Sequence, residues 1–150
     1  MNILAIDPGT TCGWAMWYSG QLSSGVWHLS TPSQRRYEGG GMRYVRLVQY
    51  LDSMPPIGLL AYEEVRRHQG VAAAHVYGGI VAHLTAWCER HCVAYCAYPV
   101  SQIKRHATGK GNADKAAMLA AAQVKWGGEV LTHDQADALW ILDLARRDNP

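Results

Sequence analysis

The fold is decided by the first strand-rich stretch of the chain, ILAIDPGTTCGWAMWYSGQLSSGVWH (residues 3–28). Ile3 to Asp7 is a short apolar run that stops at Pro8-Gly9, which is the pattern of a buried strand followed by a turn. Residues 13–18 and 21–28 are rich in Trp, Tyr and Val and flank Ser19-Gly20, which predicts a hairpin. The stretch therefore predicts three consecutive strands.

The rest of the chain alternates strands with helices. Apolar runs at 57–62 and 93–98 predict two further buried strands. We expect helices over residues 42–54, 71–92, 99 to about 106, 113–126 and 132–146, with Asn112 and Thr132 as N-caps of the last two. This order predicts an α/β fold with a central mixed five-stranded sheet flanked by helices on both faces.

Composition sets the broad class. The chain has 150 residues, 49% hydrophobic and 17% charged, which fits one globular domain over 1–150 and excludes a disordered chain. It shows no uninterrupted run of about 18 apolar residues, so we expect no membrane partner. The start lacks the basic region and cleavage site of a signal peptide, so we expect a cytoplasmic protein. The net charge of +2 does not by itself indicate a nucleic-acid binder.

The four cysteines are Cys12, Cys88, Cys92 and Cys96. Cys88 and Cys92 are four residues apart with His91 between them, a spacing that raises the alternative of a zinc site. The Cys-x2-Cys spacing and a second ligand pair are both missing. Buried, reduced thiols are therefore the better interpretation.

Carboxylates stand at the ends of several predicted elements. Asp7 ends the first strand and Glu63 ends the strand after the first helix, so parallel neighbours would bring both to one sheet edge. Asp134 and Asp137 are three residues apart and share a helix face. Such a cluster needs a compensating charge, and Mg²⁺ prefers oxygen ligands. Alternatively, these side chains are a turn residue, solvated strand-end charges and a helix-dipole partner, although Asp137 stands in an otherwise apolar face.

Four blocks of the sequence resemble the RuvC-type Holliday junction resolvases, particularly the short phage-encoded members with an RNase H-like fold. The blocks are IDPGTTCGWA (6–15), AYEEV (61–65), PVSQIK with TGKGNADK (99–104 and 108–115) and DQADAL (134–139). They cover nearly the whole chain in the family's order. The resemblance favours Glu63 over Glu64 as the functional glutamate.

The resemblance implies roles for individual residues. Asp7, Glu63, Asp134 and Asp137 would bind two Mg²⁺ ions, with Mn²⁺ as a substitute, and a metal-bound water would attack the scissile phosphate. Lys104 and Lys115 resemble the family's functional lysines and would contact phosphate oxygens. Some relatives have a histidine at the first position of the closing pair, so His133 is an alternative to Asp134.

The resemblance also implies partners and one departure. Family members act as homodimers on four-way DNA junctions, and the helix over 71–92 would supply the contact through Val76, Tyr77, Ile80 and Leu84. Arg66 stands where bacterial members carry an aromatic residue, which puts strict junction selectivity in doubt. We expect DNA contacts from Arg66, Arg67, Lys104, Arg105, Lys110 and Lys115.

Two other functions compete with this interpretation. The sequence DPGTT (7–11) is also similar to the phosphate loop of sugar kinases and actin-type ATPases, but those need two such domains. A related nuclease acting on branched DNA or RNA more generally would share the metal site. Once the four candidate ligands are set aside, basic residues clearly exceed the remaining acids, so the net charge of +2 averages an acidic pocket with a basic surface.

Overall fold

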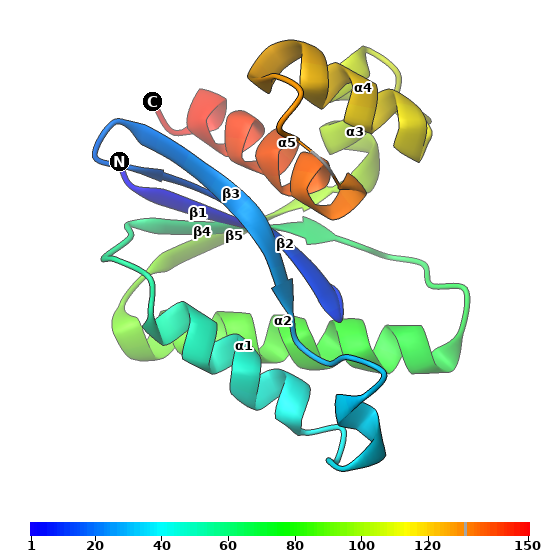
Figure 1. Ribbon diagram of the computed structural model, residues 1–150. Coiled ribbons are helices and arrows are strands. Elements are labelled where there is room, and N and C mark those ends of the chain that lie inside the picture. The colour runs from blue at the N-terminus through cyan, green and yellow to red at the C-terminus, as the bar shows by residue number, and fades with distance from the viewer. Residues whose placement is uncertain (131) are drawn as a thin grey trace.

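The computed structural model describes residues 1–130 and 132–150, which form one mixed sheet with helices on both faces (Figure 1). The strands are β1 (Ile3–Asp7), β2 (Thr11–Tyr18), β3 (Gln21–His28), β4 (Leu59–Glu64) and β5 (Ala94–Pro99). Their order across the sheet is β3-β2-β1-β4-β5. The first three strands are antiparallel to one another, whereas β4 runs parallel to both β1 and β5. The predicted α/β fold with five strands is confirmed.

Helices cover both faces of the sheet, as predicted. One face carries α1 (Met42–Asp52) and α2 (Val71–His91), and the other carries α3 (Val100–Thr108), α4 (Lys115–Trp126) and α5 (His133–Asp148) (Figure 1). A short 3-10 turn, η1 (Gln34–Arg36), interrupts the long loop before α1. The sheet therefore lies between two helical layers.

β1 lies at the centre of this arrangement and is buried on both faces. Ile3 and Ala5 belong to the core beneath α5, whereas Leu4 and Ile6 belong to the core beneath α1 and α2. All five residues of the strand are buried, including Asp7 at its end. A carboxyl group is thus carried by the most enclosed strand of the sheet, where an unpaired charge is unfavourable.

The local signals in the sequence explain most element boundaries. Ser19 and Gly20 have φ values of 49° and 81°, as a tight hairpin between β2 and β3 requires. Thr132 caps α5 as predicted, since its side chain accepts a hydrogen bond from the backbone N–H of Gln135. The prediction for Asn112 is wrong. Asp114 caps α4 instead, since its side chain accepts a hydrogen bond from the backbone N–H of Ala117 at 2.8 Å and the helix begins only at Lys115.

The long helix α2 has two different sides. Ile80, Leu84, Trp87 and Cys88 are buried beneath the sheet. By length and composition α2 is apolar enough to cross a membrane, although it contains no uninterrupted apolar run of about 18 residues. Only 22% of its most apolar window is buried. One side of α2 therefore packs into the core. The opposite side, called the open side below, is exposed and made mostly of small and apolar residues.

Candidate active site at the carboxyl ends of β1 and β4

Asp7 and Glu63 lie side by side at one edge of the sheet. β1 and β4 are parallel neighbours, and Ile6 is in register with Tyr62, so the next residue of each strand carries one of the two carboxylates. Their juxtaposition follows from strand order and direction. The expectation that both side chains emerge at the same edge is confirmed.

The N-terminal turn of α5 brings two more carboxylates to this edge. Asp134 lies in the first turn of the helix, and Asp137 follows on the same face. A cavity of about 310 Å³ is lined by all six predicted catalytic residues, together with apolar side chains and the loop after β1. These six are Asp7, Glu63, Lys104, Lys115, Asp134 and Asp137.

His133 and Glu64 are the two alternatives that the sequence left near this site. Among the described residues, the cavity lining includes Asp134 and Glu63 but neither alternative. His133 is exposed, and its Nδ1 lies 3.2 Å from the carbonyl oxygen of Lys115. Glu64 is paired with Arg66 at 3.3 Å. The geometry therefore favours Asp134 over His133 and Glu63 over Glu64.

Gly13 is a positioning residue that the sequence analysis did not single out. It lies opposite Asp7 in the β1–β2 ladder. A Cβ atom at this position would overlap the backbone carbonyl of Asp134. Only glycine lets the start of α5 approach β2 so closely, and a glycine inside a strand is the signal that marks such an approach.

Burial and mutual repulsion dominate the electrostatics of the cavity. Asp7 is only 9% exposed, and its pKa is raised well above the ordinary value, first by burial and then by the charges of Glu63, Asp137 and Asp134. Burial raises the pKa of Glu63 as well, although a hydrogen bond with Asp7 and the charge of Lys104 oppose the shift. Asp7 and Glu63 therefore hold their protons more tightly than free carboxyl groups do.

The pKa of Asp137 is set by the same opposing effects, burial and acidic neighbours against basic neighbours. Burial, followed by the charges of Glu63 and Asp134, raises its pKa to about 7, while Lys115 and Lys104 act in the opposite direction. The two lysines thus offset only part of the repulsion. Within residues 1–130 and 132–150, no group of three or more His, Cys, Asp or Glu side chains is arranged to enclose a metal ion. The carboxylates share a cavity without forming a closed ligand shell.

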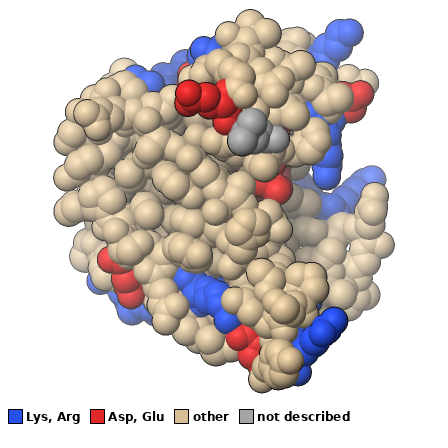
Figure 2. Space-filling view, in the orientation of Figure 1, with Lys and Arg blue, Asp and Glu red and all other residues tan. Residues whose placement is uncertain are grey.

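Basic side chains surround this cavity. Arg66 and Arg67 line an adjoining groove that shares Val100 with it. Arg105 and Lys110 are exposed on α3 and the loop that follows. In Figure 2, acidic side chains are visible within the hollow at the right, and Lys and Arg side chains stand along its rim. An acidic pocket with a basic border is what the charge pattern of the sequence predicted.

The four cysteines do not form a cluster. Cys12 lies beside the site, and burial, followed by the charges of Asp7 and Asp134, raises the pKa of its thiol. Cys12 and Cys88 are buried, Cys96 is half-buried and Cys92 is exposed, and all four thiols are free. Burial raises the pKa of the Cys88 thiol to about 11, so it remains protonated. Cys88 and Cys92 differ in environment, which does not support a zinc site. The prediction of buried thiols holds for Cys12 and Cys88 only.

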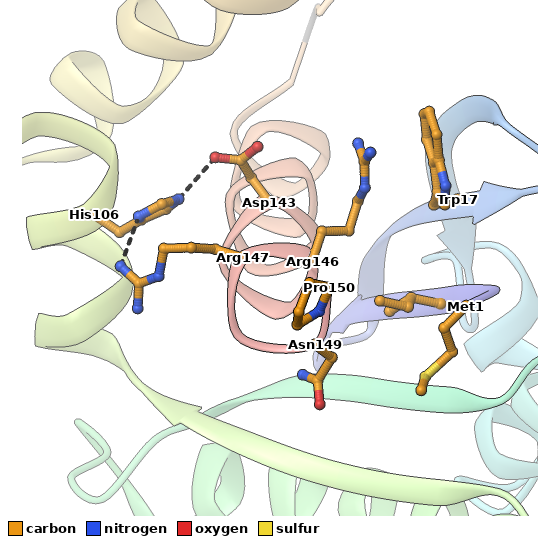
Figure 3. Close-up of a pocket in the computed structure, with 9 residues that line it drawn as sticks. Met1, Trp17, His106, Asp143, Arg146, Arg147, Asn149 and Pro150 are labelled. Carbon is orange, nitrogen blue, oxygen red and sulfur yellow. Dashed lines mark hydrogen bonds and ion pairs between the residues drawn. The ribbon is translucent and has the colours of Figure 1, made fainter.

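A second pocket lies at the opposite ends of β1 and α5 (Figure 3). There the Nε2 of His106 and the Nζ of Lys125 each lie 2.7 Å from the same Oδ2 of Asp143. Arg147 donates to the Nδ1 of His106 at 3.4 Å, so the neutral imidazole must carry its proton on Nε2. Burial tends to raise the pKa of Asp143, but its two hydrogen bonds outweigh burial and lower it. These paired groups join α3, α4 and α5.

Comparisons with known proteins bear on the fold. No protein-family profile and no curated protein matches the sequence. Among solved structures, RuvC of Thermus thermophilus is similar with a TM-score of 0.69 at 23% identity, over 99% of this chain and 97% of that one. RuvC from the same organism in complex with a Holliday junction substrate gives a TM-score of 0.71 at 24% identity, over 99% and 96%.

A third solved structure is more distant. The yeast mitochondrial Holliday junction resolvase is similar with a TM-score of 0.58 at 14% identity, over 93% of this chain and 75% of that one. The three similarities span 93–99% of this chain, so they include the sheet and the helices described above. The chain therefore has the RuvC-type, RNase H-like fold that its four sequence blocks resemble.

Proposed function

We propose that the protein is a metal-dependent endonuclease that resolves four-way DNA junctions by paired nicks. One observation carries this proposal. Four carboxylates from three separate elements meet with two lysines in one cavity, on the fold of the RuvC-type enzymes. The solved RuvC complex contains a Holliday junction, and the same fold with four carboxylates in one cavity supports a similar substrate here.

The chemistry of the donor set supports a divalent cation. The residues that would hold it are Asp7, Glu63, Asp134 and Asp137, whose repulsion is only partly offset by neighbouring lysines. Hard cations such as Mg²⁺ and Mn²⁺ take carboxylate oxygens, and two ions per site match the number of ligands. Such ions, when bound, activate a water and stabilise the leaving oxygen of a phosphodiester.

Lys104 and Lys115 would position the substrate. Both line the cavity, and both act on Asp137 strongly enough to oppose the rise in its pKa. Lysine is a compact, mobile point charge that suits non-bridging phosphate oxygens and developing negative charge. Lys104→Ala and Lys115→Ala should each lower turnover while the urea-unfolding midpoint changes little. Unchanged cleavage rates in both variants would remove these roles.

The basic border would hold the DNA arms. Arg66 is 74% exposed at its side chain and stands with Arg67 beside the cavity. Arg105 and Lys110 extend the positive surface. Contacts of this kind bind phosphates without reading sequence, so junction affinity should fall steeply as salt concentration increases. Because Arg66 stands where the resemblance places an aromatic residue, its guanidinium would either bind a phosphate or stack on an exposed base at the junction.

We propose further that two copies associate through the open side of α2. Ile80 and Leu84, two of the four residues predicted for this contact, are buried in the chain's own core and are not available. The exposed stripe of the helix runs along Val71, His75, Gly78, Ala82 and Ala86. An isologous pair would match the two-fold symmetry of a four-way junction. Ala82→Arg should convert the dimer to a monomer in sedimentation-equilibrium measurements.

A competition assay tests the proposed function. The protein is incubated with labelled four-way junction, flap, duplex and RNA–DNA hybrid together, in the presence of Mg²⁺. Symmetric paired nicks confined to the junction would support resolution, whereas equal cutting of flaps or hybrids would indicate a more general nuclease. Asp7→Asn should abolish cutting and leave junction binding largely intact. Glu129→Gln, which removes an exposed carboxylate on a loop, is the matched control.

A further inference from the structure

A further cavity, distinct from the His106–Asp143 pocket, lies directly beside the carboxylate site, between the loop after β1 and the helices α1 and α2. It has a volume of about 500 Å³, within the range of small-ligand pockets. Pro8 and Gly9 line both cavities, so the two share a wall. Most of its lining is apolar, including Val65, Val76 and Tyr77. Val76 and Tyr77 were predicted as dimer contacts, but they line this cavity and are not part of the exposed stripe of α2 proposed above for the dimer.

Arg43, on α1, is the one arginine or lysine in the lining of this cavity. Its Nε is buried and has no hydrogen-bond partner among the residues that the structure describes. Arg46, one turn further along α1, shows the usual alternative, since its guanidinium is paired with Glu38. A buried donor without an acceptor is unfavourable, and a ligand that brings an acceptor into the pocket would relieve this.

Hydrogen bonds connect the wall of this cavity to the end of β4, which carries Glu63. The hydroxyl of Tyr77 donates to the carbonyl oxygen of Glu63 at 2.8 Å and accepts from the backbone N–H of Val65 at 3.0 Å. The ring of His68 packs against Tyr77, with ring centroids 4.9 Å apart. These contacts fix the aromatic wall relative to Glu63. A group bound in this cavity would therefore be held at a fixed position relative to the carboxylate site.

We propose that this pocket binds one unstacked nucleobase of the cleaved strand, next to the scissile phosphate, with Arg43 donating to the acceptor edge of the base. The inference rests on the proposed nuclease function. A phosphate would find a single cation in a largely apolar wall, whereas a planar ring matches both the apolar lining and the donor. Guanine presents two adjacent acceptors, O6 and N7, to an arginine fork and is the preferred base. A base can enter such a pocket only after it has left its stack, as unpaired bases at the centre of a junction can do.

Fluorescence of 2-aminopurine tests whether a base enters the pocket. The probe is placed in turn at each position flanking the scissile phosphate of a junction, and full-length protein is added in EDTA so that no cutting occurs. Binding should increase the fluorescence severalfold at one position. Val76→Trp, which fills the pocket, should abolish the increase while junction affinity changes less than threefold. No increase at any position of a bound junction would overturn the proposal.

Cleavage tests the role of Arg43. In the wild type, an abasic site at the responding position should lower kcat/KM at least tenfold, and guanine should be preferred over the other bases. In Arg43→Met the abasic site should have less than a twofold further effect, and Arg43→Lys should also lose the preference. Arg90→Met, at the far end of α2, is the matched control and should keep the base preference. Circular dichroism checks that each variant is folded.

Three outcomes separate this inference from the function on which it rests. If Arg43→Met weakens all junctions equally, keeps the full abasic effect and lowers the salt slope by about one, Arg43 contacts a phosphate and the base-binding proposal is wrong. If the wild type nicks no junction at all, the proposed function itself fails. Nicking that is indifferent to the base at every flanking position would overturn the base subsite alone.

Discussion

Replacing Asp137 by Asn should stabilise the metal-free protein while abolishing metal-dependent cutting. The carboxyl of Asp137 is enclosed in the cavity, where burial and the charges of Glu63 and Asp134 raise its pKa to about 7. A carboxyl group whose pKa is raised on folding destabilises the folded state once it ionises. Asparagine keeps the shape of the side chain and removes the charge. Stability and activity are therefore expected to change in opposite directions.

The magnitude follows from the size of the shift. The pKa of Asp137 rises from 3.8 to about 7, and each unit corresponds to roughly 1.4 kcal/mol. Below the ordinary value the group is protonated in both states and contributes nothing. Between the two values the folded state binds more protons, so stability falls as pH rises. Above about pH 7 the penalty is complete, at up to about 4 kcal/mol, and this sets the upper limit of the gain in Asp137→Asn.

Urea unfolding in EDTA measures this effect. The free energies of unfolding of wild type and Asp137→Asn should be nearly equal at about pH 4 and diverge with increasing pH, with most of the gain present at pH 8. Adding Mg²⁺ at pH 8 should stabilise the wild type far more than the variant. Glu129→Gln, which removes an exposed charge, should follow the wild type. A difference between the two unfolding free energies that does not change from pH 4 to pH 8 would refute the reasoning.

Three further substitutions test how the site is positioned. Gly13→Ala should push the start of α5 away from β2, destabilise the protein by roughly 1–3 kcal/mol and remove cutting, and full activity in this variant would contradict the close approach. Thr132→Ala removes the N-cap of α5 and should lower the free energy of unfolding by about 1 kcal/mol and weaken Mg²⁺ binding measured by calorimetry. Asp143→Asn leaves His106 and Lys125 without their shared charged acceptor and should lower the unfolding free energy by roughly 1–3 kcal/mol. Its cleavage rate at saturating Mg²⁺ should stay at the wild-type value, because this cluster lies at the opposite end of the sheet, and a loss of cutting would show that the two ends are coupled.

The proximity of Asp7 and Glu63 was predictable from the sequence, because it depends only on where two strands end and on their running parallel. Each apolar run stops at a carboxylate, and parallel neighbours place their carboxyl ends at one edge. The spacing of Asp134 and Asp137 fixes a helix face in the same way. What spacing cannot supply is the distance between that helix and the strands. In this protein the distance between α5 and β2 depends on Gly13, and a hydrophobic pattern does not show that a side chain must be absent at this position.

Other features depend on tertiary packing and could not be predicted. The sequence offered Ile80 and Leu84 as interface residues, but an apolar face looks the same whether it meets its own sheet or a second copy. The helix α4 begins at Lys115 rather than at Ala113, because the side chain of Asp114, not that of Asn112, accepts the capping hydrogen bond from Ala117. The position of Arg43 beside a cavity depends on the crossing of two helices with the loop after β1.

The burial of β1 accounts for both the position and the electrostatic strain of the site. A central strand enclosed on both faces gives the Asp7 carboxyl a fixed place, and the same enclosure makes its charge unfavourable. Lys104 and Lys115 reduce the repulsion at Asp137 without cancelling it, so the cavity keeps a surplus of negative charge. Two more lysines would neutralise that surplus and compete with a divalent cation for the same oxygens. Under the proposed function, under-compensated carboxylates with basic residues at the rim would give the cavity affinity for a cation and its border affinity for DNA.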